Sequence, residues 1–367
     1  MKKIKVCVSC VNGFLTYDFI NSLKNQADFK VKIIGIDITE HTKGKILCDK
    51  FYKVNSPGKE KKYIKDIIKI YKKERFDVFY PLSDIENFII LKNKVFLKSK
   101  NVNFHLPAED YKLAKLLYNK KAFLEYCEKN NINTGKFYFV KNYLDVKKII
   151  NKNPSKRFIL KPVKGSGTKN VFLLNNKIEK KIKILESRNC YEINLKMLKD
   201  VYSFPKNGYC ILMPFYTGDM FDIDCIAKDG KIKEFAIRKR EIKNRFMYYS
   251  TGHRLIKNQK IKKLISQFVS KLNISGICDF DVIQDNNKFY LLEASCRFSG
   301  SVGVCTLGGL NFPAQMTRYI FNLRIKKYNL KANKSYRSFL VLKQIEEKKK
   351  NILLDDYIPH YAKQLSY

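Results

Sequence analysis

The sequence contains no run of 18 apolar residues, although 45% of its 367 residues are hydrophobic. A membrane-spanning helix needs about 20 such residues, so we expect no transmembrane segment. The charged start MKKIKVCVSC runs directly into a short strand and lacks the pattern of a cleavable signal peptide. These absences predict a soluble cytoplasmic protein, and its length is sufficient for two or three domains with their own cores.

Acidic residues are scarce. The chain has 34 Asp and Glu residues against 73 Lys and Arg residues, which gives a formal net charge of +39. Such a balance raises the hypothesis of a nucleic-acid partner, since Lys and Arg neutralise phosphates. The lysines, however, are spread over every segment, and we find no recognition helix, zinc module or RNP-like strand. We therefore expect no specific nucleic-acid partner and no membrane partner, with non-specific binding to nucleic acid at low salt.

The ten cysteines lack the spacing of a disulfide framework, and several fall inside predicted strands. This distribution favours reduced, buried thiols. Cys7 and Cys10 form a lone CxxC, but Cys7 lies within a strand, whereas a redox motif opens a helix. We therefore do not expect redox or zinc chemistry there.

Residues 1–105 alternate between strand and helix patterns, which predicts a parallel sheet covered by helices. The turn after the first strand, SCVNGF, lacks GxGxxG, so Asp37 at the end of the second strand is only weak support for dinucleotide binding. We expect a domain that is Rossmann-like in shape and do not predict NAD.

The remaining chain begins with helices from Pro107, and a helix boundary near Asn119 exposes Lys120. We divide the chain into a Rossmann-like domain at 1–105, a second domain at 106–330 with a lid subdomain at about 133–212, and a C-terminal extension at 331–367. Within the second domain we expect short strands with a helical segment at 176–207. Further expected elements are strands Cys210–Tyr216, Met220–Ala227, Gly230–Arg240 and Arg337–Lys343, and helices Lys260–Leu272 and Pro313–Leu323.

The stretch Lys288–Gly309 (KFYLLEASCRFSGSVGVCTLGG) combines a buried strand with a carboxylate, a hydroxyl and a guanidinium before a glycine-rich loop. Upstream, Gly276–Gln284 is a second strand, and an Asp-Asn-Asn turn predicts that the two form a hairpin. In that hairpin Asp281 and Glu293 can face one point. Two carboxylates on neighbouring strands suit Mg2+, which keeps room for waters and phosphate oxygens. A surface hairpin with solvated acids is the alternative.

The segment Phe158–Val171 (FILKPVKGSGTKNV) places Lys161 on a strand before a glycine loop and a second strand. Glycines let backbone N–H groups approach an anion, and hydroxyls and a lysine add donors and charge. This strand-loop-strand pattern differs from the Walker loop, which leads into a helix. A tight hairpin with one exposed lysine is the alternative.

These pieces occur in a recognisable order. Lys120 after a helix, Lys161 with its glycine loop, ILMPFYTGDMFDID, a strand with Arg238, then Asp281 and EASCR follow one another as in an ATP-grasp ligase. From about Val6 to Leu323 the chain resembles that superfamily, and is most similar to its carbamoyl-phosphate-synthetase-like and amino-acid-ligase branches. The resemblance implies a Rossmann-like parallel-sheet domain followed by an ATP-grasp fold, in which two α+β subdomains hold ATP between them.

The resemblance also implies roles for individual residues around ATP. Lys120, with Lys121 as the fallback, and Lys161 correspond to the phosphate-contacting cations of the family. The family's flexible loop over the phosphates corresponds to Gly165, Ser166, Gly167 and Thr168. Its hinge that holds adenine corresponds to Met213, Pro214, Phe215 and Tyr216. The hinge lacks the family's acidic residue. Met220 stands where the family has its ribose-binding Glu, and Asp219 is a substitute one residue earlier.

For the metal and the reacting groups, Asp281 and Glu293 match the magnesium carboxylates, and Ser295 replaces the usual metal-ligand Asn. Arg297 matches the arginine near the transferred phosphoryl group. Arg238 lies on the strand that in these enzymes points toward the acyl substrate.

Taken together, these correspondences predict an ATP-dependent, Mg2+-requiring carboxylate–amine ligase. It would form an amide through an acylphosphate and release ADP and phosphate. His253 is a candidate to assist the amine or a surface residue, and Cys296 is expected to face the core. Two alternatives are a non-catalytic nucleotide-binding module and, less favoured, a basic nucleic-acid-binding protein. The small-molecule substrates and the oligomeric state, a homodimer included, stay open.

Overall fold

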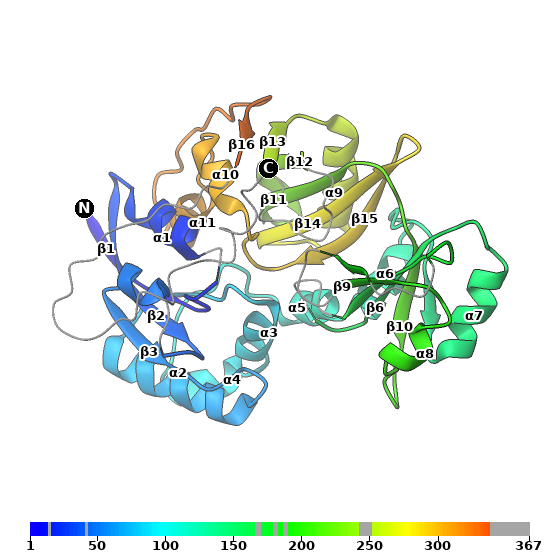
Figure 1. The fold of residues 1–367 in the computed structure, drawn as a ribbon. Coiled ribbons are helices and arrows are strands. Elements are labelled where there is room, and N and C mark those ends of the chain that lie inside the picture. The colour runs from blue at the N-terminus through cyan, green and yellow to red at the C-terminus, as the bar shows by residue number, and fades with distance from the viewer. Residues whose placement is uncertain are drawn as a thin grey trace.

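The computed structural model describes residues 1–13, 16–40, 43–165, 170–178, 183–185, 190–241 and 252–337. Three β-sheets follow one another along these ranges. Figure 1 shows the first sheet at lower left, the second at right, and the third above and between them. None of the helices in the described ranges has both the length and the apolar character needed to span a bilayer.

The first sheet is parallel, with strand order β3-β2-β1-β4, as the alternating sequence pattern predicted. Its central strand β1 has three consecutive residues with no exposed surface, Val6, Cys7 and Val8. Burial on both faces is typical of parallel strands covered by helices. The elements are β1 (Lys2–Val8), α1 (Thr16–Lys24), β2 (Phe29–Asp37), a short 3-10 helix (Lys43–Leu47), β3 (Lys50–Lys53), α2 (Glu60–Glu74), β4 (Val78–Tyr80), α3 (Asp84–Lys92) and α4 (Lys94–Ser99).

The second sheet has six strands in the order β5-β10-β6-β7-β9-β8. The expectation of a helical segment at 176–207 is wrong, because its described part contains two strands and only a one-turn helix. The segment CYEI pairs in parallel with β7, so strand pairing overrides the polar, lysine-rich composition that suggested a helix. The elements are β5 (Tyr138–Val140), α7 (Tyr143–Asn151), β6 (Phe158–Pro162), β7 (Val171–Leu174), β8 (Lys183–Leu185), β9 (Cys190–Ile193), α8 (Leu198–Val201) and β10 (Cys210–Pro214).

The third sheet is antiparallel, with strand order β15-β14-β11-β12-β13-β16. The predicted hairpin is confirmed, and both turn residues Asn286 and Asn287 have the positive φ that a tight two-residue hairpin turn requires. The strands are β11 (Met220–Lys228), β12 (Lys231–Arg240), β13 (His253–Ile256), β14 (Gly276–Asp285), β15 (Lys288–Ser295) and β16 (Ser335–Tyr336).

Five helices accompany the third sheet. They are α5 (Tyr111–Tyr118), α6 (Lys120–Lys129), α9 (Gln259–Lys271), α10 (Val302–Leu307) and α11 (Phe312–Ile320). Part of the expected glycine-rich loop after β15 is therefore the short helix α10. The predicted strand Arg337–Lys343 lies almost wholly outside the described residues, and β16 ends just before it. The domain boundaries at 105 and 330 remain predictions.

The two faces of the third sheet differ in chemistry. One face packs Ile223, Cys225 and Phe280 against α5, α6 and α9, in a core that also includes Ile211 and Met213 of the second sheet. On the other face, Ile226 and Ile277 join the core of the first sheet at one end of the strands. The other end of this face carries charged side chains.

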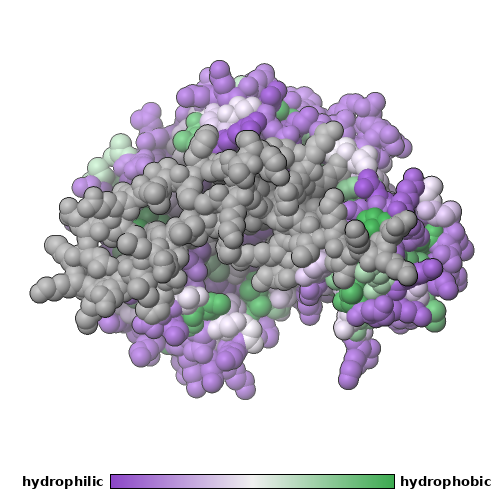
Figure 2. Space-filling view, in the orientation of Figure 1, coloured by the Kyte–Doolittle hydropathy of each residue, from purple (hydrophilic) through white to green (hydrophobic). Residues whose placement is uncertain are grey.

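The charged residues elsewhere lie largely outside these cores. In Figure 2 the coloured surface is predominantly hydrophilic, with apolar residues in small separate patches. This view agrees with lysines spread along the whole chain rather than gathered in one segment.

A buried arginine links α11 to the first sheet. Arg318 is fully buried and donates two hydrogen bonds of 2.8 Å to the carboxylate of Asp28, just before β2. These hydrogen bonds from Arg318 are the main reason why the pKa of Asp28 falls to about 2. A depressed acid pKa stabilises the folded state above the unfolded pKa near 4, and this stability is lost as the pH falls toward 2.

We therefore expect Asp28→Asn to lower the stability at neutral pH by about 1–2 kcal/mol, after allowance for the partial exposure of Asp28. The difference from the parent protein should shrink as the pH is lowered from about 7 to about 3, because the parent loses the same contribution. Thermal midpoints of the variant and the parent protein at both pH values measure this difference in stability. Asp200→Asn, at an exposed position of α8, is the control with the same charge change. A difference that does not depend on pH would contradict the prediction.

Candidate nucleotide-binding site

Lys120 lies at the junction that the sequence predicted. Asn119 ends α5 and caps α6, and its side chain accepts hydrogen bonds from the backbone N–H groups of Lys121 and Ala122. Lys120 is thus the first residue of α6, where the helix dipole disfavours a cation. Its ammonium instead forms an ion pair of 3.0 Å with Glu293 and donates to the carbonyl of Gly165. Acceptors from two other segments thus hold this ammonium at the start of the helix.

Lys161 is placed by the alternation of β6. Phe158 and Leu160 face the core of the second sheet, so Lys161 lies on the opposite face, directly across from Ile211 of β10. Ile211 belongs to the core shared with the third sheet, and this face therefore turns toward it. Burial lowers the pKa of the Lys161 amine and the charge of Lys120 lowers it further, while Glu293 acts in the opposite direction.

Asp281 and Glu293 are directly opposite each other on β14 and β15. Burial and the neighbouring carboxylates of Asp222 and Glu293 raise the pKa of Asp281 to about 7. Burial also acts to raise the pKa of Glu293, but the ammonium groups of Lys120 and Lys161 outweigh it and hold this pKa below its usual range. The structure therefore brings together four of the predicted residues, two cations and two carboxylates.

Arg240 is the arginine of β12 that reaches this group. Its Nη2 lies 3.4 Å from Asp281, and the same guanidinium binds Asp222 of the neighbouring strand. His253, expected in a polar loop, is instead a buried residue of β13 with Nε2 3.0 Å from Asp222. Burial lowers the pKa of its imidazole. Asp222 thus fixes Arg240 and His253 together.

Arg238 has a different environment. It is fully buried, with Nη2 2.6 Å from Asp224 and 2.8 Å from the hydroxyl of Ser299, and it also donates to Ser301. The structure does not bring Arg238 to an open surface. Its predicted contact with an acyl substrate would require the Ser299–Ser301 segment to move.

Ser295 and Arg297 contact the first part of the chain. The hydroxyl of Ser295 donates to Asp84, the first residue of α3, and Arg297 Nε lies 3.5 Å from the same carboxylate. Arg297 Nη1 donates to Asp279 at 2.7 Å. Asp84 was not among the predicted residues. It follows the last residue of β4 by four positions, near the edge of the parallel sheet where ligands of α/β proteins bind, but no local pattern distinguishes it from other acidic residues.

The predicted adenine hinge is formed by the end of β10 and the residues after it. Met213 is buried in the core shared by the second and third sheets. Phe215 donates its backbone N–H to the carbonyl of Arg157, and the Tyr216 ring stacks on Tyr290 with centroids 4.8 Å apart. Asp219 forms an ion pair of 2.6 Å with Lys239, which is opposite Phe221 and therefore on the other face from Asp222. Its role as a ribose ligand stays a prediction.

Other predicted residues lie outside the described ranges or in the core. Ser166, Gly167 and Thr168 are not among the described residues, and Gly165 is the last described residue before them. Cys296 is 3% exposed within the core, as predicted. Cys7 and Cys10 are free thiols, and burial raises the pKa of each well above its usual value.

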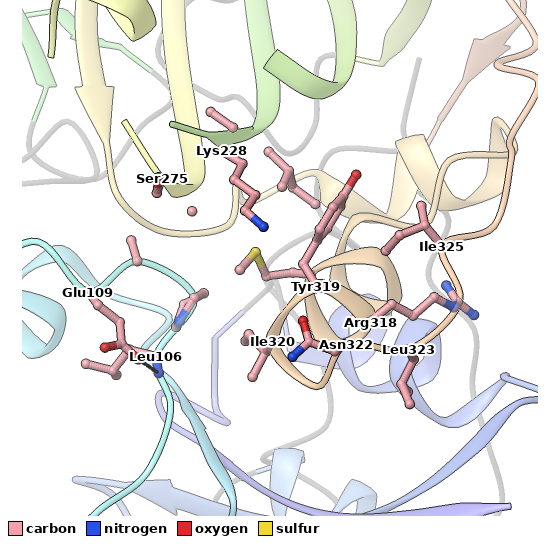
Figure 3. A pocket seen from close by; sticks show the side chains of 16 residues that line it. Leu106, Glu109, Lys228, Ser275, Arg318, Tyr319, Ile320, Asn322, Leu323 and Ile325 are labelled. Carbon is pink, nitrogen blue, oxygen red and sulfur yellow. Dashed lines mark hydrogen bonds between the residues drawn. The ribbon is translucent and has the colours of Figure 1, made fainter. Parts of the chain in front are cut away.

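A separate pocket of about 500 Å³ lies at the other end of β11 and β14. Lys228, Ser275 and Tyr319 are among its lining residues, which Figure 3 shows between the third sheet and α11. It contains none of the residues predicted to bind ATP or metal.

The burial of Arg238 leads to a prediction. Arg238→Met leaves Asp224 buried without its cation, which should cost about 3–5 kcal/mol of stability. Arg254→Met on the neighbouring strand, where the side chain is 53% exposed, should cost less than about 1 kcal/mol. Chemical and thermal denaturation measure both. If Arg238→Met were as stable as the parent but inactive, Arg238 would be a substrate contact and not a structural ion pair.

Comparisons with known proteins show which families the chain resembles. Residues 207–342 match the family described as "ATP-grasp in the biosynthetic pathway with Ter operon". D-aspartate ligase of Enterococcus faecium is 25% identical over 231 residues, which are 60% of this chain and 53% of that protein. The chain thus spans about half the length of this curated relative.

Two solved structures share the fold. N5-carboxyaminoimidazole synthetase of Staphylococcus aureus complexed with ADP has a TM-score of 0.64 at 15% identity, over 90% of this chain and 81% of that one. L-amino acid ligase of Bacillus licheniformis has a TM-score of 0.62 at 15% identity, over 87% and 74%. The fold expected from the sequence is confirmed, and residues 207–342 match an ATP-grasp family model.

Proposed function

We propose that the protein is an ATP-dependent carboxylate–amine ligase that forms an amide through an acylphosphate, releasing ADP and phosphate. The observation that carries this proposal is the convergence of Lys120 and Lys161 on Asp281 and Glu293, with Lys120 3.0 Å from Glu293. The printed names of the relatives, a D-aspartate ligase and an L-amino acid ligase, support an amino-acid substrate. Mg2+ and ATP are the proposed cofactor and co-substrate.

The residues present fit Mg2+. Asp281 and Glu293 offer hard oxygen donors from directly opposite positions of paired strands. No group of three or more His, Cys, Asp and Glu side chains within the described ranges would hold a metal on its own. Two carboxylates suit a metal that takes its remaining ligands from water and phosphate oxygens. When bound, Mg2+ would supply charge neutralisation along the triphosphate.

The cations of the chain have the complementary task. Phosphorylating a carboxylate brings two anions together, so Lys120 and Lys161 would hold the phosphate oxygens and offset the repulsion. Lys161 suits this role because it is partly buried, where a fixed charge acts more strongly than in water. Arg297 is proposed to contact the transferred phosphoryl group, and residues 213–216 the adenine.

The proposed reaction balances in two steps. A carboxylate oxygen of the substrate attacks the terminal phosphorus, and the bond from that phosphorus to ADP breaks. The amine nitrogen then attacks the acyl carbon, a C–N bond forms, and the C–O bond to phosphate breaks. When the amine enters as a primary ammonium ion, its nitrogen loses two protons, one to the departing phosphate and one to solvent, and keeps the third in the amide.

A non-catalytic nucleotide-binding module is the second candidate. Met220 in place of the expected ribose ligand and the Ser295 hydroxyl bound to Asp84 favour it, because both reduce the expected ligand set. ATP that binds but stays intact after long incubation with a panel of carboxylates and amines would support the non-catalytic module.

For the ligase, Lys161→Ala and Glu293→Gln should each lower ADP release in Mg2+ by about 100-fold or more, because each removes a charge that faces the reacting phosphates. A coupled ADP assay with a panel of amino acids as carboxylate and amine measures it. Lys164→Ala, three residues along and exposed, is the matched control and should keep the parent rate. If no member of a broad panel gives ADP and calorimetry finds no Mg-ATP binding, the ligase proposal fails.

A further inference from the structure

The pocket at the far end of β11 and β14 has the character of a small-molecule site. Its volume of about 500 Å³ lies in the range of such sites, which are lined mostly by apolar side chains with a few polar groups. Its lining comes from residues 106–109, from the ends of β11 and β14, and from α11 with the residues after it. Figure 3 shows these side chains around one space. The proposed ligase reaction leaves this pocket without a role.

The walls of the pocket are held in place by the protein itself. Ile277 donates its backbone N–H to the carbonyl of Pro107 at 3.0 Å, and Ala108 forms an antiparallel bridge with Gly276. At Gly276 φ is +121°, and a Cβ there would lie 2.4 Å from the Pro107 carbonyl oxygen, so this close approach requires glycine. On the opposite side, the buried Arg318 ties α11 to the first sheet. The pocket is therefore formed before any ligand arrives.

One charged group of the lining has no protein partner. Among the described residues, Lys228 at the end of β11 forms no ion pair, and Figure 3 shows its side chain extending into the pocket toward the ring of Tyr319. Glu109 also lines the pocket, but Lys94 lies 2.5 Å from its carboxylate and offsets its charge. The uncompensated charge at the pocket is thus positive, which favours an anion.

We propose that this pocket is a second ligand site, which binds a small carboxylate with an apolar body through Lys228. The carboxylate accepts hydrogen bonds from the Lys228 ammonium, and a charge-assisted contact of this kind is stronger than a neutral one. The body of the ligand lies against Ile226, Met316 and Ile320, where it leaves water. Binding needs neither nucleotide nor metal, so the inference does not depend on the ligase function.

A ligand in this pocket contacts three parts of the molecule at once. The segment 106–109 follows the first sheet, β11 and β14 belong to the third sheet, and α11 packs against both. A ligand that binds the folded protein and not the unfolded chain raises its stability. The occupied pocket should therefore raise the thermal midpoint in a saturable manner.

The test compares three molecules that share one apolar chain and differ in the head group, namely octanoate, 1-octanol and octylamine. Met316 is a local reporter, because it lines the pocket and the chain has only six methionines. Carbon-13 methyl NMR of the full chain at physiological salt follows its signal, which Met316→Leu assigns. Met197, which packs against the core of the second sheet, is the reference and should not respond.

Octanoate should shift the Met316 signal in a saturable manner, and 1-octanol should bind about 10-fold more weakly, with octylamine weaker still. The affinity should rise about 4-fold per methylene from butanoate to octanoate, because each methylene leaves water. Lys228→Gln should raise the octanoate Kd about 10-fold and leave the 1-octanol Kd unchanged.

The matched control is Lys231→Gln. Lys231 is exposed and lies directly opposite Lys228 on β12, but it does not line the pocket. Its variant has the same charge change and should keep the octanoate Kd of the parent protein. Equal affinity for octanoate and 1-octanol, or equal losses in the two lysine variants, overturns the binding of a carboxylate by Lys228. Absence of a Met316 shift with all three molecules overturns the site itself, and neither result bears on ADP release.

Discussion

The charged half of one face of the third sheet is the constraint on which the candidate site depends. Strand pairing places Asp222, Asp281 and Glu293 across three neighbouring strands, on one face and at one level. Carboxylates this close repel one another, and burial adds to the cost of their charge. The fold accommodates them because cations come from other segments, Lys120 from a helix junction, Lys161 from the second sheet and Arg240 from β12.

This constraint explains why the arginines of β12 differ. Arg238 and Arg240 share a face, but Arg238 lies nearer the apolar end, where Ile226 and Ile277 pack against the first sheet. Its guanidinium is enclosed by Asp224 and two serine hydroxyls. Arg240, two residues further along β12, reaches Asp281 at the charged end of this face. One strand thus supplies both an internal ion pair and a side chain close to the proposed reaction.

Much of the fold could be predicted because local patterns agree with it. The alternating strands and helices of residues 1–105 gave the parallel sheet, and an Asp-Asn-Asn turn between apolar strands gave the hairpin that pairs Asp281 with Glu293. Short strands were harder. The strand Cys190–Ile193 has only four residues and depends on its pairing with β7, which no local pattern shows.

The contribution of Asp84 was beyond local patterns for a related reason. Its partners Ser295 and Arg297 are more than two hundred positions away, and only the docking of α3 beside β15 brings them together. Acidic residues after short strands are common, so the sequence alone does not single out Asp84. The same applies to Asp222, whose importance lies in holding Arg240 and His253 at once.

The position of Lys120 at the start of α6 has a consequence for how a nucleotide enters. A cation at the positive end of a helix is favourable only while an anion accompanies it, and Glu293 is that anion in this structure. A triphosphate is a stronger partner for the same ammonium. Its arrival would exchange one counter-ion for another and release Glu293, so that one lysine couples the filling of the proposed phosphate site to the freeing of a proposed magnesium ligand.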